Sequence, residues 1–140
     1  MSDPAADFVT ALPFNTLVGL SADGDALALR DADALHNHVG TVHAGALFTL
    51  GEATSGVAIA RNVAAALGGA MPVTRSASIA YRKPARGRIR ATARLAEAVE
   101  EIAARLKGDG KASFDVNVVL EDDAGVEVAT MTVAWYVRAA

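Results

Sequence analysis

The sequence contains no cysteine, so disulfide bridges and thiolate metal sites are excluded. Only 5% of the residues are aromatic, and two of the three histidines flank a single asparagine, a spacing that does not favour a metal site. Positive charge is not in excess: 13 Lys and Arg face 16 Asp and Glu, and the net charge of −3 argues against nucleic acid as a partner. The lack of cysteine leaves the compartment open, and we expect the cytoplasm.

The one long apolar stretch covers residues 44–66, where Glu52 and Arg61 are the only charged residues. A helix that is apolar all round is typically buried in the protein. The charge-free part of this stretch is shorter than the ~20 residues that a bilayer requires. An acid near the middle of a membrane-spanning helix would also cost about 2.5–3.5 kcal/mol on insertion. No second apolar span and no signal peptide is apparent. We therefore expect no membrane insertion and a single soluble domain over residues 1–140, long enough to bury a core.

Downstream of this helix the hydrophobic period changes to two, which is typical of strands with one buried face. In residues 88–95 every odd position is apolar and every even position is polar. The patterns predict strands over residues 73–81, 88–95, 114–120 and 126–137. Upstream, residues 19–30 indicate a strand pair or one long bent strand about Asp23-Gly24. Short amphipathic helices are predicted over residues 6–12 and 96–107.

This order of elements predicts an α+β fold, in which an antiparallel sheet wraps around one long central helix. Such a sheet covers only one side of the helix. A second copy of the same chain is the simplest cover for the other side, so we expect a homodimer, or a dimer of dimers.

Two motifs stand out in the sequence. The first is Asn37-x-x-Gly40-x-x-His43-Ala44-Gly45-Ala46-Leu47 followed by Glu52, and the second is Tyr81-Arg82-Lys83-Pro84-Ala85-Arg86-Gly87. With these motifs the chain resembles the hotdog-fold acyl-CoA thioesterase superfamily, in its phenylacetate-pathway-like branch, or a closely related domain family of unassigned function. The resemblance extends from about residue 15 to residue 138 and implies a hotdog fold and the hydrolysis of an acyl-CoA to a free acid and coenzyme A. Two features depart from the pattern: Ala44 stands where many relatives have glycine, and the segment 97–110 is longer than the usual short turn.

The start of the apolar helix is the predicted site for the thioester carbonyl. Negative charge develops on that oxygen during hydrolysis, and the unpaired backbone N–H groups of Ala44 and Gly45 can stabilise it from a fixed position. Asn37 either donates its amide to the same oxygen or holds the loop before the helix. We expect His43 to position the helix start more than to act as the base.

Glu52 is the predicted catalytic carboxylate, which attacks the thioester as a nucleophile or activates a water molecule as a general base. The alternative is a structural acid that is satisfied by backbone donors, by Arg61 or by Arg75. In some relatives a hydroxyl about one turn after the acid assists the reaction, and Ser55, with Thr54 beside it, is the candidate here.

Spacing along the helix separates the two halves of this site. Gly45 and Glu52 are seven residues apart, so their backbones lie roughly 10 Å apart along a helix, too far to meet one carbonyl easily. If two such helices run antiparallel across a dimer axis, the acid of one lies near the start of the other. This arrangement resembles the composite site of the superfamily.

A basic cluster around Pro84 and Gly87 of the second motif predicts a binding site for the phosphates of coenzyme A. Its members are Arg82, Lys83, Arg86 and Arg88. The alternative is a solvated basic turn. Coenzyme A is expected only as part of the substrate, with no separate cofactor and no metal.

Two other functions stay open beside hydrolysis. One is a non-catalytic acyl-CoA-binding or regulatory module. The other is a hotdog hydratase or dehydratase acting on an enoyl or hydroxyacyl thioester, which would normally show a catalytic histidine beside a proline-rich turn, whereas no proline lies near His43. The acyl group itself is not specified by the sequence.

Overall fold

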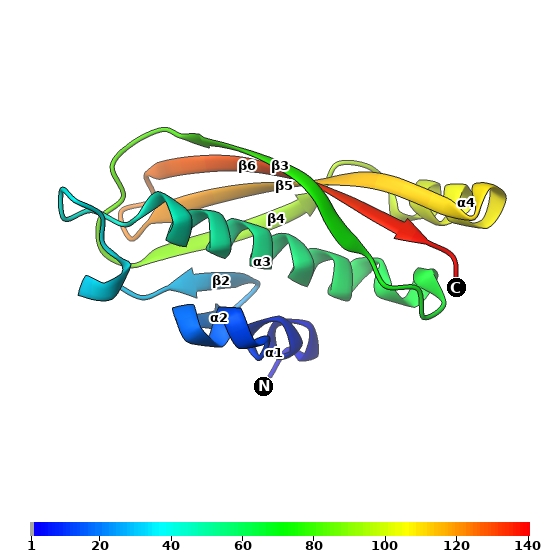
Figure 1. Cartoon of the computed structure of the whole chain (residues 1–140), viewed down its shortest axis with the longest axis horizontal. Coiled ribbons are helices and arrows are strands. Elements are labelled where there is room, and N and C mark those ends of the chain that lie inside the picture. The colour runs from blue at the N-terminus through cyan, green and yellow to red at the C-terminus, as the bar shows by residue number, and fades with distance from the viewer. Residues whose placement is uncertain (1) are drawn as a thin grey trace.

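The computed structural model describes residues 2–140 and contains one six-stranded sheet with a long helix, α3, lying across one face (Figure 1). The helices are α1 (Pro4–Thr10), α2 (Pro13–Val18), α3 (Ala44–Asn62) and α4 (Val99–Asp109), with short 3-10 turns η1 (Asp33–Leu35) and η2 (Ala64–Leu67). The strands are β1 (Leu20–Asp23), β2 (Ala26–Leu29), β3 (Val73–Tyr81), β4 (Ile89–Leu95), β5 (Lys111–Asp122) and β6 (Glu127–Arg138).

The sheet has the order β1-β2-β4-β5-β6-β3, and every neighbouring pair is antiparallel. On β5 the side chains of Phe114, Val116, Val118 and Leu120 are buried while their neighbours face solvent, as the alternation predicts. The predicted α+β fold, with an antiparallel sheet against one long helix, is therefore confirmed. The segment 19–30 is a strand pair and not one bent strand, because Asp23 pairs with Ala26 across a turn in which Gly24 has a φ of 61°.

The central helix α3 packs closely on the sheet. Leu47, Leu50 and Val57 are buried in the main core, and Gly51 lets the helix approach β6, because a Cβ there would lie 2.5 Å from the sulfur of Met131. The helix was expected over residues 44–66 but ends at Asn62, and the chain continues as the 3-10 turn η2.

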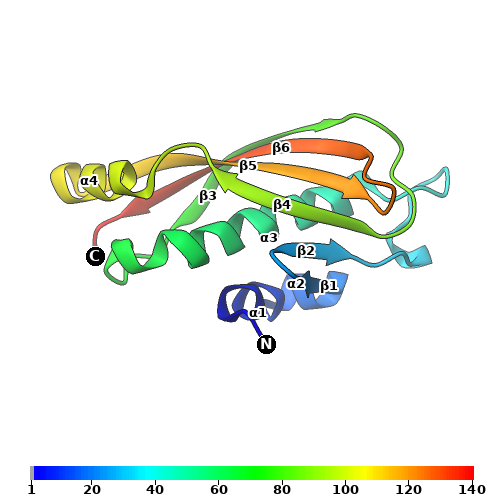
Figure 2. The same cartoon turned by 180° about the vertical axis from the view of Figure 1, so that it is seen from behind.

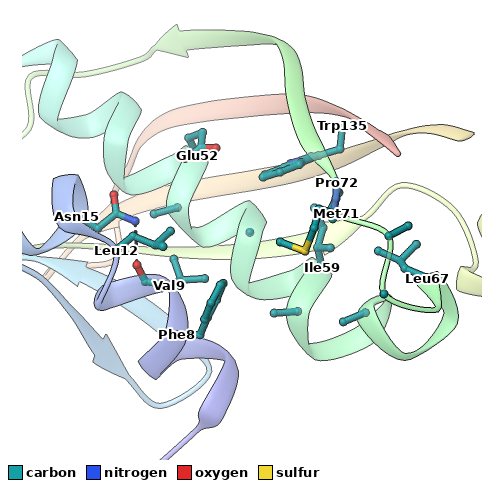
Figure 3. A pocket seen from close by; sticks show the side chains of 16 residues that line it. Phe8, Val9, Leu12, Asn15, Glu52, Ile59, Leu67, Met71, Pro72 and Trp135 are labelled. Carbon is teal, nitrogen blue, oxygen red and sulfur yellow. Dashed lines mark hydrogen bonds between the residues drawn. The ribbon is translucent and has the colours of Figure 1, made fainter. Parts of the chain in front are cut away.

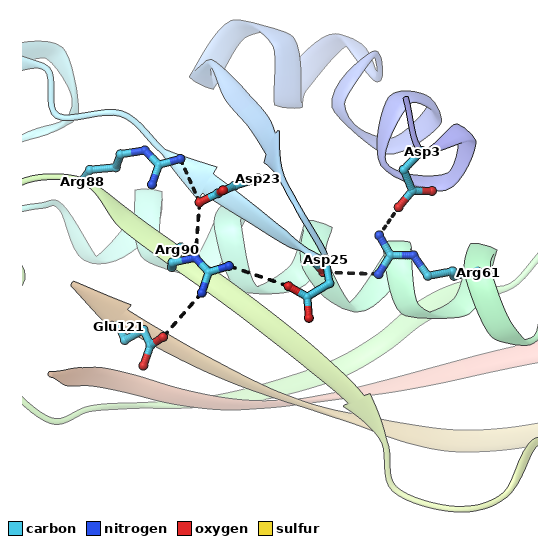
Figure 4. Close-up of polar contacts among 7 residues, drawn as sticks. All are labelled: Asp3, Asp23, Asp25, Arg61, Arg88, Arg90 and Glu121. Carbon is cyan, nitrogen blue, oxygen red and sulfur yellow. Dashed lines mark hydrogen bonds and ion pairs between the residues drawn. The ribbon is translucent and has the colours of Figure 1, made fainter. Parts of the chain in front are cut away.

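Two helices precede the sheet where one was predicted. The helix predicted over residues 6–12 was placed too far along at its C-terminal end. Helix α1 stops at Thr10, and Pro13 begins the separate helix α2. Proline fits this place because the first residue of a helix has no intrahelical partner for its N–H. An ion pair between Asp3 and Arg61 ties α1 to the far end of α3 (Figure 4).

Helix α4 lies at the end of the sheet where β6 finishes (Figures 1 and 2). It begins at Val99, not at residue 96, and ends before Gly110, which has a φ of 72°. Ile102 and Leu106 are buried in a second core cluster with Phe114 of β5. None of the helices in the described part of the chain has the length and hydrophobicity that a membrane crossing requires.

Candidate functional site

The start of α3 opens into a hollow of about 320 Å³ to which both sequence motifs contribute. Asn37 and Ala44 come from the first motif, and Tyr81, Arg82 and Lys83 from the second. The structure therefore brings these motifs together, although they are far apart in the sequence. We call this space the α3 hollow.

Asn37 holds the loop that leads into α3. Its side-chain oxygen accepts hydrogen bonds from the backbone N–H groups of Val39 and Thr41, each at 3.0 Å. Its amide nitrogen donates to the Thr41 hydroxyl at 2.7 Å and to the Val42 carbonyl at 3.4 Å. Of the two roles considered for Asn37, these contacts within one chain correspond to holding the loop before the helix.

The first two amides of α3 differ in what they bind. The Gly45 N–H donates to Nδ1 of His43 at 2.8 Å, so a neutral His43 carries its proton on Nε2. This contact favours glycine, since a Cβ at position 45 would lie 3.0 Å from Nδ1. Among residues 2–140, the backbone N–H of Ala44, an exposed residue, donates no hydrogen bond. The open amide at the α3 hollow is therefore that of Ala44, while Gly45 and His43 cap the helix.

Tyr81 also shapes this helix start, and the sequence patterns did not single it out as a functional residue. Its hydroxyl donates to the Ala44 carbonyl at 3.0 Å, so the end of β3 is tied to the first turn of α3. Burial raises the pKa of Tyr81, which keeps its hydroxyl protonated as a donor at neutral pH.

Glu52 lies on the open side of α3. Phe48, Glu52 and Gly56 follow at intervals of four, which places them on one stripe, and each is only partly covered. The carboxylate Oε2 accepts a hydrogen bond from the Thr74 hydroxyl at 2.8 Å. Among residues 2–140 no Lys, Arg or His forms an ion pair with Glu52, so the alternative of a pair with Arg61 or Arg75 is not seen.

Glu52 borders a cavity of about 500 Å³ with mostly hydrophobic walls, which we call the apolar cavity (Figure 3). Its walls come from α1, α3, the segment after η2, and β6, through side chains that include Phe8, Ile59, Met71 and Trp135. The one other strongly polar lining residue, Asn15, already donates to the Val9 carbonyl at 2.9 Å. Among the described residues that line this otherwise hydrophobic space, Glu52 is thus the only charged one.

The hydroxyl of Ser55 forms two hydrogen bonds within the protein. Its fully buried hydroxyl donates to the Glu52 carbonyl at 2.6 Å and accepts the indole N–H of Trp135 at 3.0 Å. Thr54 is buried too, and its hydroxyl donates to the Leu50 carbonyl at 2.6 Å. Neither hydroxyl lines the apolar cavity. Ser55 fixes the orientation of Trp135, a residue that the sequence patterns did not identify.

The four basic residues in and directly after the second motif do not form one cluster. Arg82 lines the α3 hollow, where its guanidinium donates to the Thr130 hydroxyl at 3.0 Å, and Lys83 lies beside it. Arg86 is exposed but does not line the hollow.

Arg88 belongs to a different surface, the ion-pair network of Figure 4. Its guanidinium lies 3.0 Å from Asp23, which also pairs with Arg90 at 3.2 Å. The hydrogen bond from Arg88 lowers the pKa of Asp23. Arg88 therefore joins β4 to β1 in this structure.

The α3 hollow and the apolar cavity share no lining residue. Within one chain the open Ala44 amide and the Glu52 carboxylate consequently face different spaces. Among residues 2–140 no group of three or more His, Asp or Glu side chains is placed to hold a metal ion.

Comparisons with known proteins agree with the fold. Residues 7–137 match the family described as "Domain of unknown function (DUF4442)". A Pseudomonas aeruginosa protein of unknown function, described as a "probable thioesterase", is 28% identical with a TM-score of 0.86, over 98% of this chain and 95% of that one. None of the curated proteins that were compared matches the chain.

Two further crystal structures share the hotdog fold. A Bacillus halodurans protein solved with CoA is 24% identical, with a TM-score of 0.71 over 91% of this chain and 76% of that one. A phenylacetic acid degradation-related protein of Ralstonia eutropha, named as a candidate thioesterase, is 22% identical, with a TM-score of 0.68 over 96% of this chain and 99% of that one.

Proposed function

The chain belongs to the DUF4442 family, and from this premise we propose that it is a hotdog-fold thioesterase that hydrolyses an acyl-CoA to a free acid and coenzyme A. The observation that carries the proposal is the Glu52 carboxylate, which has no cationic partner among the described residues and borders an apolar cavity of about 500 Å³. An apolar cavity with a single charged group suits a ligand with a hydrocarbon part and one reacting polar centre. An acyl thioester has this composition.

In the proposed reaction the acyl chain occupies the apolar cavity and its carbonyl lies at Glu52. As a general base, Glu52 takes a proton from water while the water oxygen bonds to the carbonyl carbon. The C–S bond then breaks, and the proton passes to the departing thiolate. As a nucleophile, the Glu52 carboxylate would instead bond to the carbonyl carbon while the C–S bond breaks, which gives a mixed anhydride and the thiolate. Water then hydrolyses the anhydride to the free acid and regenerates the Glu52 carboxylate, and the proton released goes to the thiolate. Thr74 positions the carboxylate in both cases.

The oxyanion site is proposed to come from a second copy of the chain. The open stripe of α3, with Phe48 and Glu52, offers a surface for an antiparallel partner helix, and the exposed Met71 and Val73 extend it. That pairing would bring the partner's open helix start toward Glu52 and form two equivalent sites per dimer. Arg82 and Lys83 at the α3 hollow would then meet the phosphates of coenzyme A, with Arg86 close to them in the sequence.

The test of the catalytic role is Glu52→Gln, with Glu101→Gln on the exposed face of α4 as its matched control. Free thiol released from a panel of acyl-CoAs is expected to fall by roughly 10²–10⁴-fold in the first variant, the range for loss of a general base, and to stay unchanged in the second. Both variants should melt within a few degrees of the parent protein. Undiminished thiol release by folded Glu52→Gln protein would refute the assignment.

The composite site is tested by mixing two inactive variants, Asn37→Ala and Glu52→Ala. The first damages the loop before α3 and the second removes the carboxylate, so each mixed dimer contains one site with both defects and one intact site. Random exchange of equal amounts should restore about a quarter of the parent activity. No recovery, despite exchange shown with mass-tagged subunits, would mean that both groups act within one chain.

A further inference from the structure

A cleft on the opposite face of the sheet from α3 gathers four cationic side chains. Arg75 of β3, Arg105 of α4, Lys111 of β5 and Arg138 of β6 line a space of about 480 Å³, together with Asp109. We call it the cationic cleft. Lys111 begins β5 and Arg138 ends β6, and these strand ends lie beside α4 at one end of the sheet (Figure 2). The protein as a whole has a net charge of −3.

Tyr136 organises two of these arginines. Arg138 donates to the Tyr136 hydroxyl through Nε and Nη2, both at 3.3 Å, and the Arg75 guanidinium lies 4.7 Å from the centre of the Tyr136 ring. The β5–β6 register places Lys111 directly beside Arg138. Arg75 reaches this face at a register irregularity of β3, and such bulges re-aim a side chain.

Three of the four positive charges lack a carboxylate partner. Arg105 pairs with Glu97 at 2.5 Å, and its second nitrogen donates to the Ser113 carbonyl at 2.8 Å. Within residues 2–140 no carboxylate lies within ion-pair distance of Arg75, Lys111 or Arg138.

The local potential is correspondingly positive. The hydrogen bond from Arg138 lowers the pKa of Tyr136, and the charges of Lys111 and Arg75 act in the same direction. Asp109 also lines the cleft but forms no ion pair with Arg75, Lys111 or Arg138. These three cations repel one another, and a bound anion would relieve that repulsion.

We propose that the cationic cleft binds a phosphate-bearing small molecule, a phosphate monoester or a diphosphate, through Arg75, Lys111 and Arg138. A phosphate group carries up to two negative charges, which matches several cations better than the single charge of a carboxylate does. Guanidinium groups also present their N–H donors in the geometry that phosphate oxygens accept. The proposed phosphate binding stands independently of the thioesterase activity, and only the assignment of the ligand as the substrate nucleotide rests on the proposed function.

The ligand has two potential sources, which share this phosphate chemistry. One is the nucleotide end of an acyl-CoA. Thr74, which holds Glu52, precedes Arg75, and Trp135 of the apolar cavity precedes Tyr136, so the cleft and the proposed site lie on opposite faces of the same two strands, β3 and β6. In that case the nucleotide passes round the β3 edge of the sheet, and the cleft takes the place of Arg82 and Lys83 as its phosphate site. The other is a separate phosphorylated metabolite that binds beside the site.

The experiment is calorimetric titration with inorganic pyrophosphate and, separately, with coenzyme A. The test variant is Arg75→Glu/Lys111→Glu, and the control is Arg30→Glu/Arg94→Glu, which changes the net charge equally at positions outside the cleft. If the charge-reversed protein does not fold, as judged by circular dichroism, Arg75→Gln/Lys111→Gln replaces it. Loss of two charge-assisted contacts should weaken pyrophosphate binding at least about tenfold, with the control changed less than about twofold.

Either of two results would overturn the proposal: the parent protein does not bind pyrophosphate, or the control weakens binding as much as the test variant does. Weaker binding of coenzyme A by the test variant would support the cleft and identify the substrate nucleotide as its ligand. Unchanged coenzyme A affinity together with lost pyrophosphate binding would support the cleft as a site for a separate phosphorylated ligand. Because hydrolysis is not measured, a protein without thioesterase activity would refute the proposed function and would leave the result on phosphate binding by the cleft unaffected.

Discussion

Two glycines of α3 should respond in opposite ways to the same substitution. Gly51 faces the sheet and Gly56 faces the apolar cavity, and both lie in the interior of the helix. Replacing either by alanine removes the helix penalty of glycine, which is about 1 kcal/mol relative to alanine. The environment of the added methyl group therefore decides the sign of the change in the free energy of unfolding.

At Gly56 the methyl group fits without displacing anything. Its Cβ would lie 3.8 Å from Val9 and 4.0 Å from Trp135, which are ordinary van der Waals distances. Gly56→Ala should therefore stabilise the protein by about 1 kcal/mol, or roughly 3–4 °C in melting temperature for a chain of this size. Since the methyl group enters the cavity, KM for a long acyl-CoA should rise at least about fivefold, because one methylene is worth about 1–3 kcal/mol in a hydrophobic pocket.

At Gly51 the same methyl group meets the core. Its Cβ would lie 2.5 Å from the sulfur of Met131, a side chain that is only 3% exposed, and 3.6 Å from Leu120. Overpacking a core costs about 1–3 kcal/mol, although the flexible methionine yields more easily than backbone would. After the helix gain is subtracted, Gly51→Ala should destabilise the protein by about 1 kcal/mol.

Thermal unfolding followed by circular dichroism measures this difference, expected to be about 2 kcal/mol between the two variants. Thiol release from acyl-CoAs of increasing chain length then separates the two positions, because only Gly56→Ala should affect long chains selectively. If Gly56→Ala is destabilising, the space beside Gly56 is not open and the apolar cavity does not have the proposed shape. Equal stability of the two variants would contradict the close packing of Gly51 on β6.

Two further predictions concern the aromatic residues. Of the two tyrosines, Tyr136 should ionise at lower pH than Tyr81, because the hydrogen bond from Arg138 lowers the pKa of Tyr136 while burial raises that of Tyr81. Ultraviolet titration of the protein and of Tyr136→Phe should show that this variant loses the earlier transition, and loss of the later one would contradict the assignment. Ser55→Ala should cost about 1–3 kcal/mol of unfolding free energy, because it leaves the part-buried indole N–H of Trp135 without its acceptor. The fluorescence of Trp135, the only tryptophan, should change in this variant, and an unchanged emission spectrum would indicate that the contact does not form in solution.

The elements that were predicted well are those whose pattern is both long and regular. The alternation of residues 88–95 specified β4 within one residue, and the apolar stretch from Ala44 specified the start of α3. Helix α2 was missed because six residues with Phe14 and Leu17 exposed carry no readable amphipathic period. The end of α3 was placed too late, since the alanines that follow Val63 favour a helix locally, whereas the chain tightens into a 3-10 turn.

The candidate site was predictable where its residues are neighbours in the sequence, as in the helix start and Glu52. Its other contacts join distant segments: the Thr74 hydroxyl reaches Glu52 across 22 residues, and the Tyr81 hydroxyl reaches Ala44 across 37 residues. The register of β3 against β6 and its packing beside α3 decide which side chains of β3 meet the helix, and no local pattern encodes this. The partner of Arg88 is equally non-local, so its charge alone suggested a phosphate site where the structure has an ion pair with Asp23.

The segment 97–110, which is longer than the turn expected from the resemblance, contributes both to the second core and to the cationic cleft. It contains α4, which buries Ile102 and Leu106 against β5 and so closes a second core at the end of the sheet. The same packing directs Arg105 and Asp109 toward the strand ends that carry Lys111 and Arg138. A short turn in place of α4 would leave the cationic cleft without this wall and expose the second core. The segment therefore links the stability of this end of the protein to its positive potential, and a variant that loosens α4 should weaken pyrophosphate binding even if every cleft residue is intact.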